Sequence, residues 1–264
     1  MQTNELNQDG PAKARQTVGV LGKALDVLEE IIWSPPRSVG ELAAITGVEK
    51  AAVYRITNTL VDRGFAVKDE ETRKYRSGPR LAAAATWLDR TQDIAKLAGP
   101  YMRTLREEFE ETVNLGVLVG QEIQYLDILE SRHSLRMSVE AGTRHNAYST
   151  ALGKAILACR SAEGARLIMG GRSSLKKVTS HTISDWDAFA ADLEQVRHRG
   201  YSIDFEENEL GAVCVAAAVG APSESATYAI SISCPVARVG RGEIHKIGER
   251  LVQVCSALSD ESPS

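Results

Sequence analysis

Apolar residues recur at helical spacing in the first part of the chain. Between residues 20 and 32 they lie three and four positions apart until Pro35-Pro36 ends the pattern, which predicts a first helix. Ser38 and Glu41 have the spacing of a capping box. A second, short helix is therefore expected to begin after Ser38, and Gly47 is suited to close it in a left-handed conformation.

The third predicted helix, residues 49–62, has two different faces. Val53, Ile56 and Leu60 form an apolar stripe that a core would bury. The opposite face is polar, as on any soluble helix, but its cation, guanidinium, amide and phenol also suit phosphate oxygens and base edges in a DNA major groove. The residues of this polar face are Lys50, Tyr54, Arg55 and Asn58.

A basic hairpin is predicted directly after this helix. Residues 65–67 and 74–76 are short strand-like runs around a polar turn at residues 69–72. Helix, corner, helix and hairpin together indicate a winged helix-turn-helix over residues 17–79, preceded by a disordered arm over residues 1–16. The basic residues of the hairpin are Arg73, Lys74 and Arg76.

The pattern changes twice beyond the hairpin. Alanine-rich sequence favours a linker helix over residues 80–92, and an amphipathic pattern predicts another helix over residues 93–111, which Pro100 either kinks or starts. Alternating apolar and polar residues then predict antiparallel strands with helices between them, an α+β domain over residues 93–264. The predicted strands are residues 113–119, 123–129, 135–139, 211–219 and 228–233, and the predicted helices are residues 149–158, 185–199 and 240–258.

Composition and charge add an asymmetry between the two ends. At 264 residues, with 43% hydrophobic and 25% charged residues, the chain is long enough for two globular domains. Residues 11–80 hold 12 Lys and Arg against nine Asp and Glu, a balance of +3, whereas the remaining residues hold 19 against 26, a balance of −7. This distribution favours a nucleic-acid partner for the first domain only.

The four cysteines are far apart, and their spacing to one another and to histidine does not suggest a zinc site. No segment resembles a signal peptide or a membrane-spanning helix. We therefore expect reduced thiols in a cytoplasmic, nucleoid-associated protein with no membrane partner and no cofactor.

Three segments of the second domain could bind a small molecule. The loop that enters the helix at residues 149–158 would present main-chain N–H groups to an anion such as a carboxylate. The segments 200–216 and 228–235 add a carboxylate, a thiol and two hydroxyls that the strand period turns to one face. Together these groups predict a small polar cavity with apolar walls. The side chains concerned are Asp204, Cys214, Ser231 and Ser233.

Each of these residues also has a purely structural interpretation. Cys214 stands among small apolar residues and could be a buried core residue. Asp204 and Glu207 could cap a turn or lie on the surface, and Lys154 could be a solvated helix residue. The spacing of these residues leaves both interpretations open.

The most specific pattern in the chain runs from Gly200 to Gly220. It reads glycine, three residues, Asp204, two residues, Glu207, six residues, Cys-Val-Ala, two residues and Val-Gly. Together with TALGKAILA at residues 150–158, AISIS at residues 229–233 and the opening VLGKALDVLEE, it resembles the IclR family of bacterial transcriptional regulators. The resemblance extends from residue 18 to the last helix.

This resemblance implies a winged helix-turn-helix, a linker helix and a GAF-like effector-binding domain. It implies a regulator that binds double-stranded operator DNA with palindromic or paired half-sites, as a homodimer and often as a tetramer. Either a repressor of a catabolic operon or an activator is compatible with it. Main-chain amides at Ala151 and Leu152 would hold the carboxylate of an organic or aromatic acid. The same site would be lined by Asp204, Cys214, Ser231 and Ser233, with an apolar wall at Met137.

The chain departs from the family pattern at the start of its third helix. Ala51-Ala52 replaces a frequent Ser-Thr pair, and Tyr54 replaces a common histidine. Two potential phosphate-contacting hydroxyls are therefore absent, and the operator sequence stays open. The residues predicted to contact DNA are Lys50, Ala51, Tyr54, Arg55, Asn58, Arg73, Lys74 and Arg76.

Two other classes of function compete with this interpretation. Cys214 or a serine could act as a nucleophile with His145 or Asp204, but no base, nucleophile and orienting group are recognisable from spacing, so we predict that the chain is not an enzyme. A metal site could use His145, Cys159 or Cys214, but their spacing does not favour one, and no metal is expected.

Overall fold

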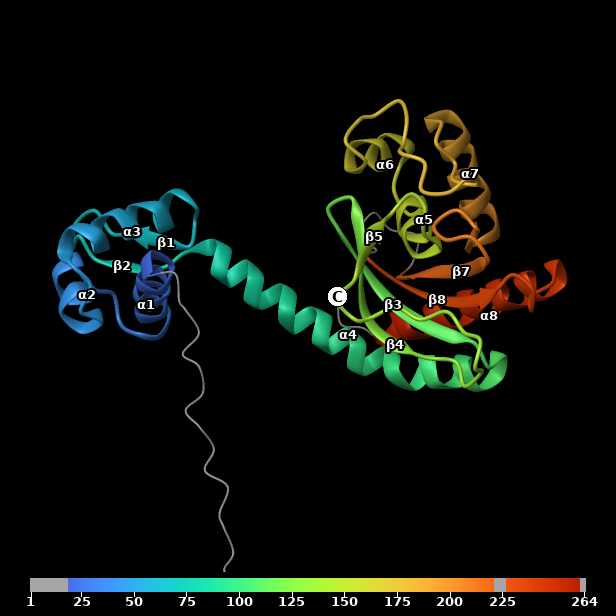
Figure 1. The fold of residues 1–264 in the computed structure, drawn as a ribbon, viewed down its shortest axis with the longest axis horizontal. Helices are drawn as coiled ribbons and strands as arrows, with labels where there is room; N and C mark the ends of the chain where they lie inside the picture. The colour runs from blue at the N-terminus through green and yellow to red at the C-terminus, as the bar shows by residue number, and fades with distance from the viewer. Residues whose placement is uncertain (1–18, 221–226, 262–264) are drawn as a thin grey trace, which may run out of the picture. The chain divides into compact units, whose positions relative to one another are not determined.

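The computed structural model of the chain describes residues 19–220 and 227–261 (Figure 1). The predicted arm over residues 1–16 lies outside the described residues. The chain divides into two compact units between Asp89 and Arg90, and each unit has its own hydrophobic core.

In its described residues the first unit contains three helices and a two-stranded hairpin, as the winged helix-turn-helix prediction requires, followed by the beginning of a longer fourth helix. Ser38 caps the second helix, and its main-chain N–H donates to the Glu41 carboxylate at 2.7 Å, so the predicted capping box is present. Gly47 closes that helix with a φ of 68°. The elements are α1 (Gly19–Trp33), α2 (Val39–Thr46), α3 (Lys50–Asp62), β1 (Ala66–Lys68) and β2 (Tyr75–Ser77).

The buried stripe of α3 differs in part from the prediction. Val53 is fully buried, but Ile56 and Leu60 are only half-buried, and Thr57 takes a core position instead. The Thr57 hydroxyl donates to the Tyr54 carbonyl at 3.1 Å, which satisfies a polar group inside an apolar core. A hydrophobic pattern alone could not have shown this local hydrogen bond.

The two helices expected over residues 80–92 and 93–111 are one continuous helix, α4 (Pro79–Phe109). Pro100 lies inside it and neither starts nor ends it. Proline removes one main-chain N–H, and the packing of the flanking turns offsets this loss. Ile94, Ala98, Met102 and Leu105 recur at helical spacing and are all buried.

The second unit is built on one antiparallel sheet of order β5-β4-β3-β8-β7-β6, which confirms the predicted α+β class. The predicted strand at residues 135–139 is wrong, since the Met137 carbonyl accepts a side-chain hydrogen bond from Thr112 instead of joining a ladder. The strands are β3 (Thr112–Val119), β4 (Glu122–Leu129), β5 (Arg144–Asn146), β6 (Ser202–Phe205), β7 (Ala212–Val219) and β8 (Tyr228–Pro235).

Helices cover both faces of this sheet (Figure 1). The second half of α4 packs with α8 (Arg241–Glu261) on one face. On the other face lie α5 (Ala151–Ala158), α6 (Ala162–Ile168) and α7 (Trp186–Arg199). The sequence prediction lacked the short elements α6, β5 and β6. The alternation of side chains along β3, β7 and β8 sends Val, Leu and Ile toward α8 and leaves smaller and polar residues toward α5.

Gly153 allows α5 to lie directly on the main chain of the loop before it. A methyl group on Gly153 would overlap the carbonyl of Ala147. We expect Gly153→Ala to lower the free energy of unfolding by about 3 kcal/mol, because neither main chain can move freely. Urea unfolding followed by circular dichroism measures this change. Gly242→Ala in the first turn of α8 is the control. A methyl group there would contact no neighbouring segment within 4 Å, so this substitution should be neutral or stabilising. Equal effects of the two substitutions would contradict the packing argument.

Candidate functional site

A row of polar side chains crosses four neighbouring strands of the second unit. The register pairs Asp204 of β6 with Cys214 of β7, Cys214 with Ser233 of β8, and Ser233 with Thr112 of β3. Paired residues point to the same face of a sheet. The row therefore faces α5, and the prediction that Ser231 and Ser233 share this face is confirmed.

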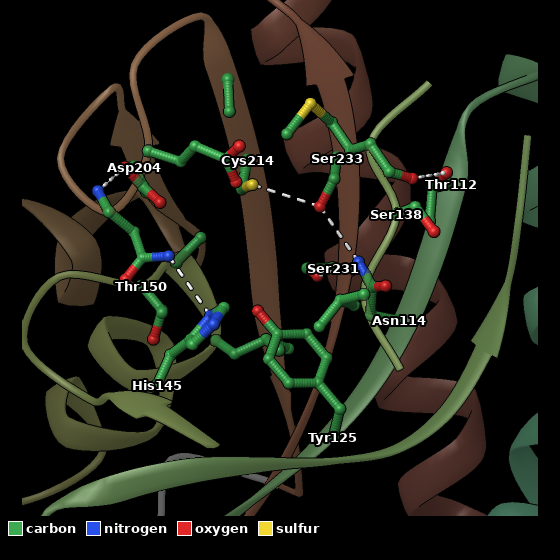
Figure 2. Close-up of a pocket in the computed structure, with 17 residues that line it drawn as sticks. Thr112, Asn114, Tyr125, Ser138, His145, Thr150, Asp204, Cys214, Ser231 and Ser233 are labelled. Carbon is green, nitrogen blue, oxygen red and sulfur yellow. Dashed lines mark hydrogen bonds between the residues drawn. The ribbon is translucent and has the colours of Figure 1, made fainter. Parts of the chain in front are cut away.

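Hydrogen bonds connect the middle of the row (Figure 2). Asn114, paired with Ser231 in the register, donates from Nδ2 to the hydroxyl of Ser231 at 3.2 Å and to that of Ser233 at 3.0 Å. The Cys214 thiol donates to the Ser233 hydroxyl at 3.1 Å. These contacts fix the side chains of β3, β7 and β8 relative to one another.

The start of α5 faces this row. Thr150 caps the helix by accepting from the Gly153 N–H at 3.2 Å, and Ala151 and Leu152 follow at the mouth of the helix. Gly116 of β3 makes room for Leu152, because a methyl group there would lie 2.9 Å from the leucine side chain. The first N–H groups of a helix have no acceptor within it, and they attract anions.

Between α5 and the polar row lies a pocket with about 550 Å³ of space, its open mouth included. All seven residues of the predicted effector site line it: Met137, Ala151, Leu152, Asp204, Cys214, Ser231 and Ser233. The sequence prediction did not include ten further lining residues, which are Thr112, Asn114, Tyr125, Ser138, Val139, His145, Thr150, Asn208, Glu209 and Ala212.

Some of the missed residues left a signal in the sequence. Asn114 is a polar residue in the middle of an apolar strand, where an amide needs a specific role. His145 was considered only as a catalytic or metal-binding group, whereas its ring nitrogen Nδ1 lies 3.2 Å from the Asn208 amide at the pocket wall. Tyr125 packs edge-on against His145, with 5.5 Å between ring centres. Only the tertiary fold brings these side chains together.

The pocket contains carboxylates but no lysine or arginine among its described lining residues. Burial raises the pKa of Asp204 to about 7, against the opposing effects of Lys154 and of the N–H groups that Asp204 accepts from. Burial likewise raises the pKa of the Tyr125 hydroxyl and lowers that of His145. At neutral pH Tyr125 and His145 are therefore uncharged, and Asp204 is only partly ionised.

Cys214 does not have the environment of an activated nucleophile. Burial, and then the charge of Asp204, raise the pKa of its thiol well above the ordinary value. A nucleophilic cysteine requires the opposite shift. This environment argues against the enzyme hypothesis built on Cys214.

A buried ion cluster holds the wall behind Asp204. Lys154 is only 1% exposed, and its ammonium lies 2.5 Å from Glu207 and 2.9 Å from Asp192, so it is not a solvated helix residue. The main-chain N–H of Glu207 donates to Asp204 at 2.7 Å. Glu207 therefore connects Asp204 to α5, because it contacts Asp204 through its main chain and Lys154 of α5 through its carboxylate.

A second concave surface lies on the first unit, between α3 and the hairpin. The exposed face of α3 and the tip of the hairpin line it together. Asn58 lines a separate depression, and Arg73 lies 3.5 Å from Glu70, which screens part of its charge. Of the residues predicted to contact DNA, this surface brings together Lys50, Ala51, Tyr54, Arg55 and Arg73, whereas Lys74 and Arg76 do not line it. Its other lining residues are Ser38, Val39, Gly40, Glu49, Lys68 and Tyr75.

Two comparisons by sequence profile decide the family. The model for the bacterial transcriptional regulator IclR C-terminal domain matches residues 85–260, and that for the IclR helix-turn-helix domain matches residues 20–70. The chain belongs to the IclR family. It is therefore a DNA-binding transcriptional regulator whose C-terminal domain binds an effector.

Individual proteins of the IclR family resemble the whole chain. It is 30% identical to the HTH-type transcriptional regulator BhcR of Paracoccus denitrificans, over 92% of this chain and 86% of that protein. It is 29% identical to the transcriptional repressor IclR of Escherichia coli, over 94% of this chain and 91% of that protein. An IclR homologue from Microbacterium hydrocarbonoxydans, solved with 4-hydroxybenzoate, shares the fold at 18% identity, with a TM-score of 0.60 over 92% of this chain and 100% of that one.

Two further observations concern the described part of this IclR-family chain. None of its helices in that part has the length and apolar content needed to cross a membrane. In residues 19–220 and 227–261, no three His, Cys, Asp or Glu side chains converge as metal ligands would.

The raised pKa of Asp204 predicts a pH-dependent stability of this regulator. In the unfolded chain the carboxyl ionises near its ordinary pKa of 3.8, but in the folded protein it ionises at about 7. The folded protein therefore holds the proton of Asp204 more tightly than the unfolded chain does. The resulting stabilisation is complete below the unfolded pKa of 3.8 and is lost as the pH rises through the folded pKa of about 7. Between pH 5 and 6 the loss should be about 1.4 kcal/mol per pH unit, and near pH 7 the slope should fall to about half of that value. Asp204→Asn should remove the part of the slope that Asp204 contributes, while Glu207, whose pKa burial also raises, still contributes to the remainder.

Chemical unfolding at pH 5, 6, 7 and 8 measures the slope for both proteins. Glu209→Gln is the matched control, since it removes an exposed carboxylate from the same pocket and should retain the wild-type slope. Parallel pH profiles for the wild type and Asp204→Asn would show that Asp204 ionises normally in the folded protein.

Proposed function

We propose that this IclR-family regulator is a repressor of a catabolic operon that responds to a small organic or aromatic acid. The observation that carries the proposal is the pocket between the polar row and the start of α5. Its anion-attracting end is the helix start at Ala151 and Leu152, and its other described lining residues are neutral polar or apolar apart from the carboxyls of Asp204 and Glu209. The 4-hydroxybenzoate complex of the Microbacterium homologue and the repressor role of the E. coli relative support the same assignment.

The carboxylate of such an acid would lie at the start of α5. Main-chain N–H groups and the helix dipole stabilise an anion there without a cationic side chain. Asp204, Cys214, Ser231 and Ser233 would contact the remainder of the molecule, and Met137 would provide an apolar wall. The absence of lysine and arginine among the described lining residues makes the helix start the most favourable position for negative charge.

The operator would be bound by α3 and the hairpin. Lys50 and Arg55 are exposed on α3, and neither forms an ion pair with another described residue, so both charges are free for phosphates or bases. Tyr54 is also exposed, at 53%, on the same face. In this arrangement α3 enters the major groove, and the hairpin contacts the adjacent backbone.

A homodimer is part of the proposal, and a tetramer follows if two dimers associate. The first helix, α1, buries only Val27 and Ile31 in its own unit. Leu28 and Ile32 are half-buried, but four further large apolar residues are exposed, which is unusual for a helix of a monomer. These residues are Val20 at 77%, Leu21 at 56%, Leu25 at 49% and Trp33 at 84%. Pairing of two such faces would set two copies of α3 on paired half-sites.

Binding to promoter fragments tests the DNA-binding surface. Arg55→Ala should weaken operator binding by about 1–3 kcal/mol if the guanidinium contacts a base. Fluorescence anisotropy at two salt concentrations separates this loss from a general loss of charge, since a phosphate contact also lowers the salt dependence. Arg103→Ala, which removes the same charge from an exposed position of the second unit, should bind like the wild type. Unchanged affinity in both Arg55→Ala and Asn58→Ala would contradict the assignment of α3 as the helix that reads the operator.

The same titration tests the response to an acid. Addition of 4-hydroxybenzoate or of short aliphatic acids should release the wild-type protein from DNA. An effector that binds the DNA-free state more tightly than the DNA-bound state lowers the affinity of the protein for DNA. An acid that binds the free protein and leaves or strengthens its DNA affinity would contradict the proposed mode of repression.

A further inference from the structure

Asn114 has a hydrogen-bonding capacity that the protein does not use. Its side chain is 98% buried, as the 2% exposure of the residue indicates, and it lines the pocket. The amide nitrogen donates to Ser231 and Ser233, but the carbonyl oxygen is buried and has no partner among the described residues. Buried polar atoms in folded proteins nearly always have a partner, and this one borders a cavity that could hold one.

The unused capacity does not depend on which way the amide is turned. The hydroxyls of Ser231 and Ser233 can donate or accept, so exchanging the amide oxygen and nitrogen would leave the NH₂ group without a partner instead. A ligand group that both donates and accepts would satisfy either orientation. A hydroxyl has this property.

A second polar group of the pocket is also available. Tyr125 extends its hydroxyl toward the interior of the pocket (Figure 2), and no described residue forms a hydrogen bond with it. Figure 2 shows Asn114 across the pocket from Thr150 and Asp204. The polar group that meets Asn114 is therefore separate from the carboxylate that the start of α5 would hold.

The charges of the pocket restrict what this second group can be. Asp204 and Glu209 line the pocket, and no described lysine or arginine does. A second carboxylate on the ligand would lie among like charges and neutral side chains with no cation to offset its desolvation. A neutral hydroxyl avoids this cost.

We propose that Asn114 is a specificity-determining residue that selects a monocarboxylic acid carrying a hydroxyl group on the part of the molecule away from the carboxylate. This inference rests on the proposed acid-sensing function and names the class of acid. The hydroxyl completes the hydrogen bonding of the Asn114 amide, whose oxygen an acid without that hydroxyl leaves unpaired.

Matched pairs of acids that differ by one hydroxyl test the proposal. The pairs are 3-hydroxypropionate and propionate, 3-hydroxybutyrate and butyrate, and 4-hydroxybenzoate and benzoate, titrated into the full chain by calorimetry. The wild type should bind the hydroxylated member of at least one pair at least about tenfold more tightly. In Asn114→Leu this ratio should fall to about one, because neither acid then leaves an amide unpaired.

The ratio is measured within one variant, so a smaller folded fraction affects both members of a pair equally. Asn114→Asp keeps an acceptor at the same place and should retain a preference for the hydroxylated acid, although both acids bind more weakly beside the added charge. Gln124→Leu is the control, since it removes an amide of β4 that does not line the pocket and that accepts from Arg144 at 3.0 Å, and it should leave the ratio unchanged.

Three outcomes overturn the inference. A wild-type ratio near one in every pair that binds would refute the selection by Asn114 and leave acid sensing intact. A preference that persists in Asn114→Leu would assign the selection to another residue. If none of the acids binds, both the acid-sensing function and this inference fail, whereas operator binding, tested separately with Arg55→Ala, is unaffected.

Discussion

The antiparallel register of β6, β7, β8 and β3 is the constraint on which the pocket depends. It places Asp204, Cys214, Ser233 and Thr112 in one row and Asn114 beside Ser231. A shift of one residue in any pair would turn that strand's polar residues toward α8 and its valines and isoleucines toward α5. The large apolar residues that pack under α8 therefore determine the position of the polar row on the other face. The core on one side of the sheet specifies the site on the other.

Polar groups on this buried face are costly, and most of them are held by several contacts at once. Asp204 accepts from two main-chain N–H groups, Lys154 pairs with two carboxylates, and Glu207 accepts from Thr182 at its carbonyl at 2.7 Å. Removing one partner of such a cluster would leave a buried charge unpaired. The loop that carries Glu207 is consequently fixed to α5 and to the segment around Thr182. The pocket wall is thus formed before any ligand binds, which lowers the ordering cost of binding.

The parts of the fold that depend on local sequence were predictable, and those that depend on tertiary contacts were not. The capping box at Ser38, the left-handed Gly47 and the alternation along β7 and β8 are local and were predicted correctly. Residues 135–139 have the composition of a strand, but they do not pair with a neighbouring strand of the sheet. Pro100 suggested a helix boundary, yet the buried stripe of α4 continues through it. For the site, residue chemistry indicated Asp204, Cys214 and the two serines. Asn208 and Tyr125 reach the pocket only through the fold, and the unpaired amide of Asn114 is visible only in the folded core.

The pKa of Asp204 connects the stability of the pocket with its occupation. With a pKa of about 7, the Asp204 carboxyl changes its charge in the neutral range, while Tyr125 and His145 of the same lining stay uncharged. A carboxylate bound at the start of α5, as proposed, brings a like charge into the same pocket and raises the pKa of Asp204 further. Binding of an acid is then linked to uptake of a proton at Asp204, because the protonated form offers a donor in place of a repelling charge. The conditions that stabilise the folded pocket are thus the ones that favour an anionic effector, since both depend on the same proton.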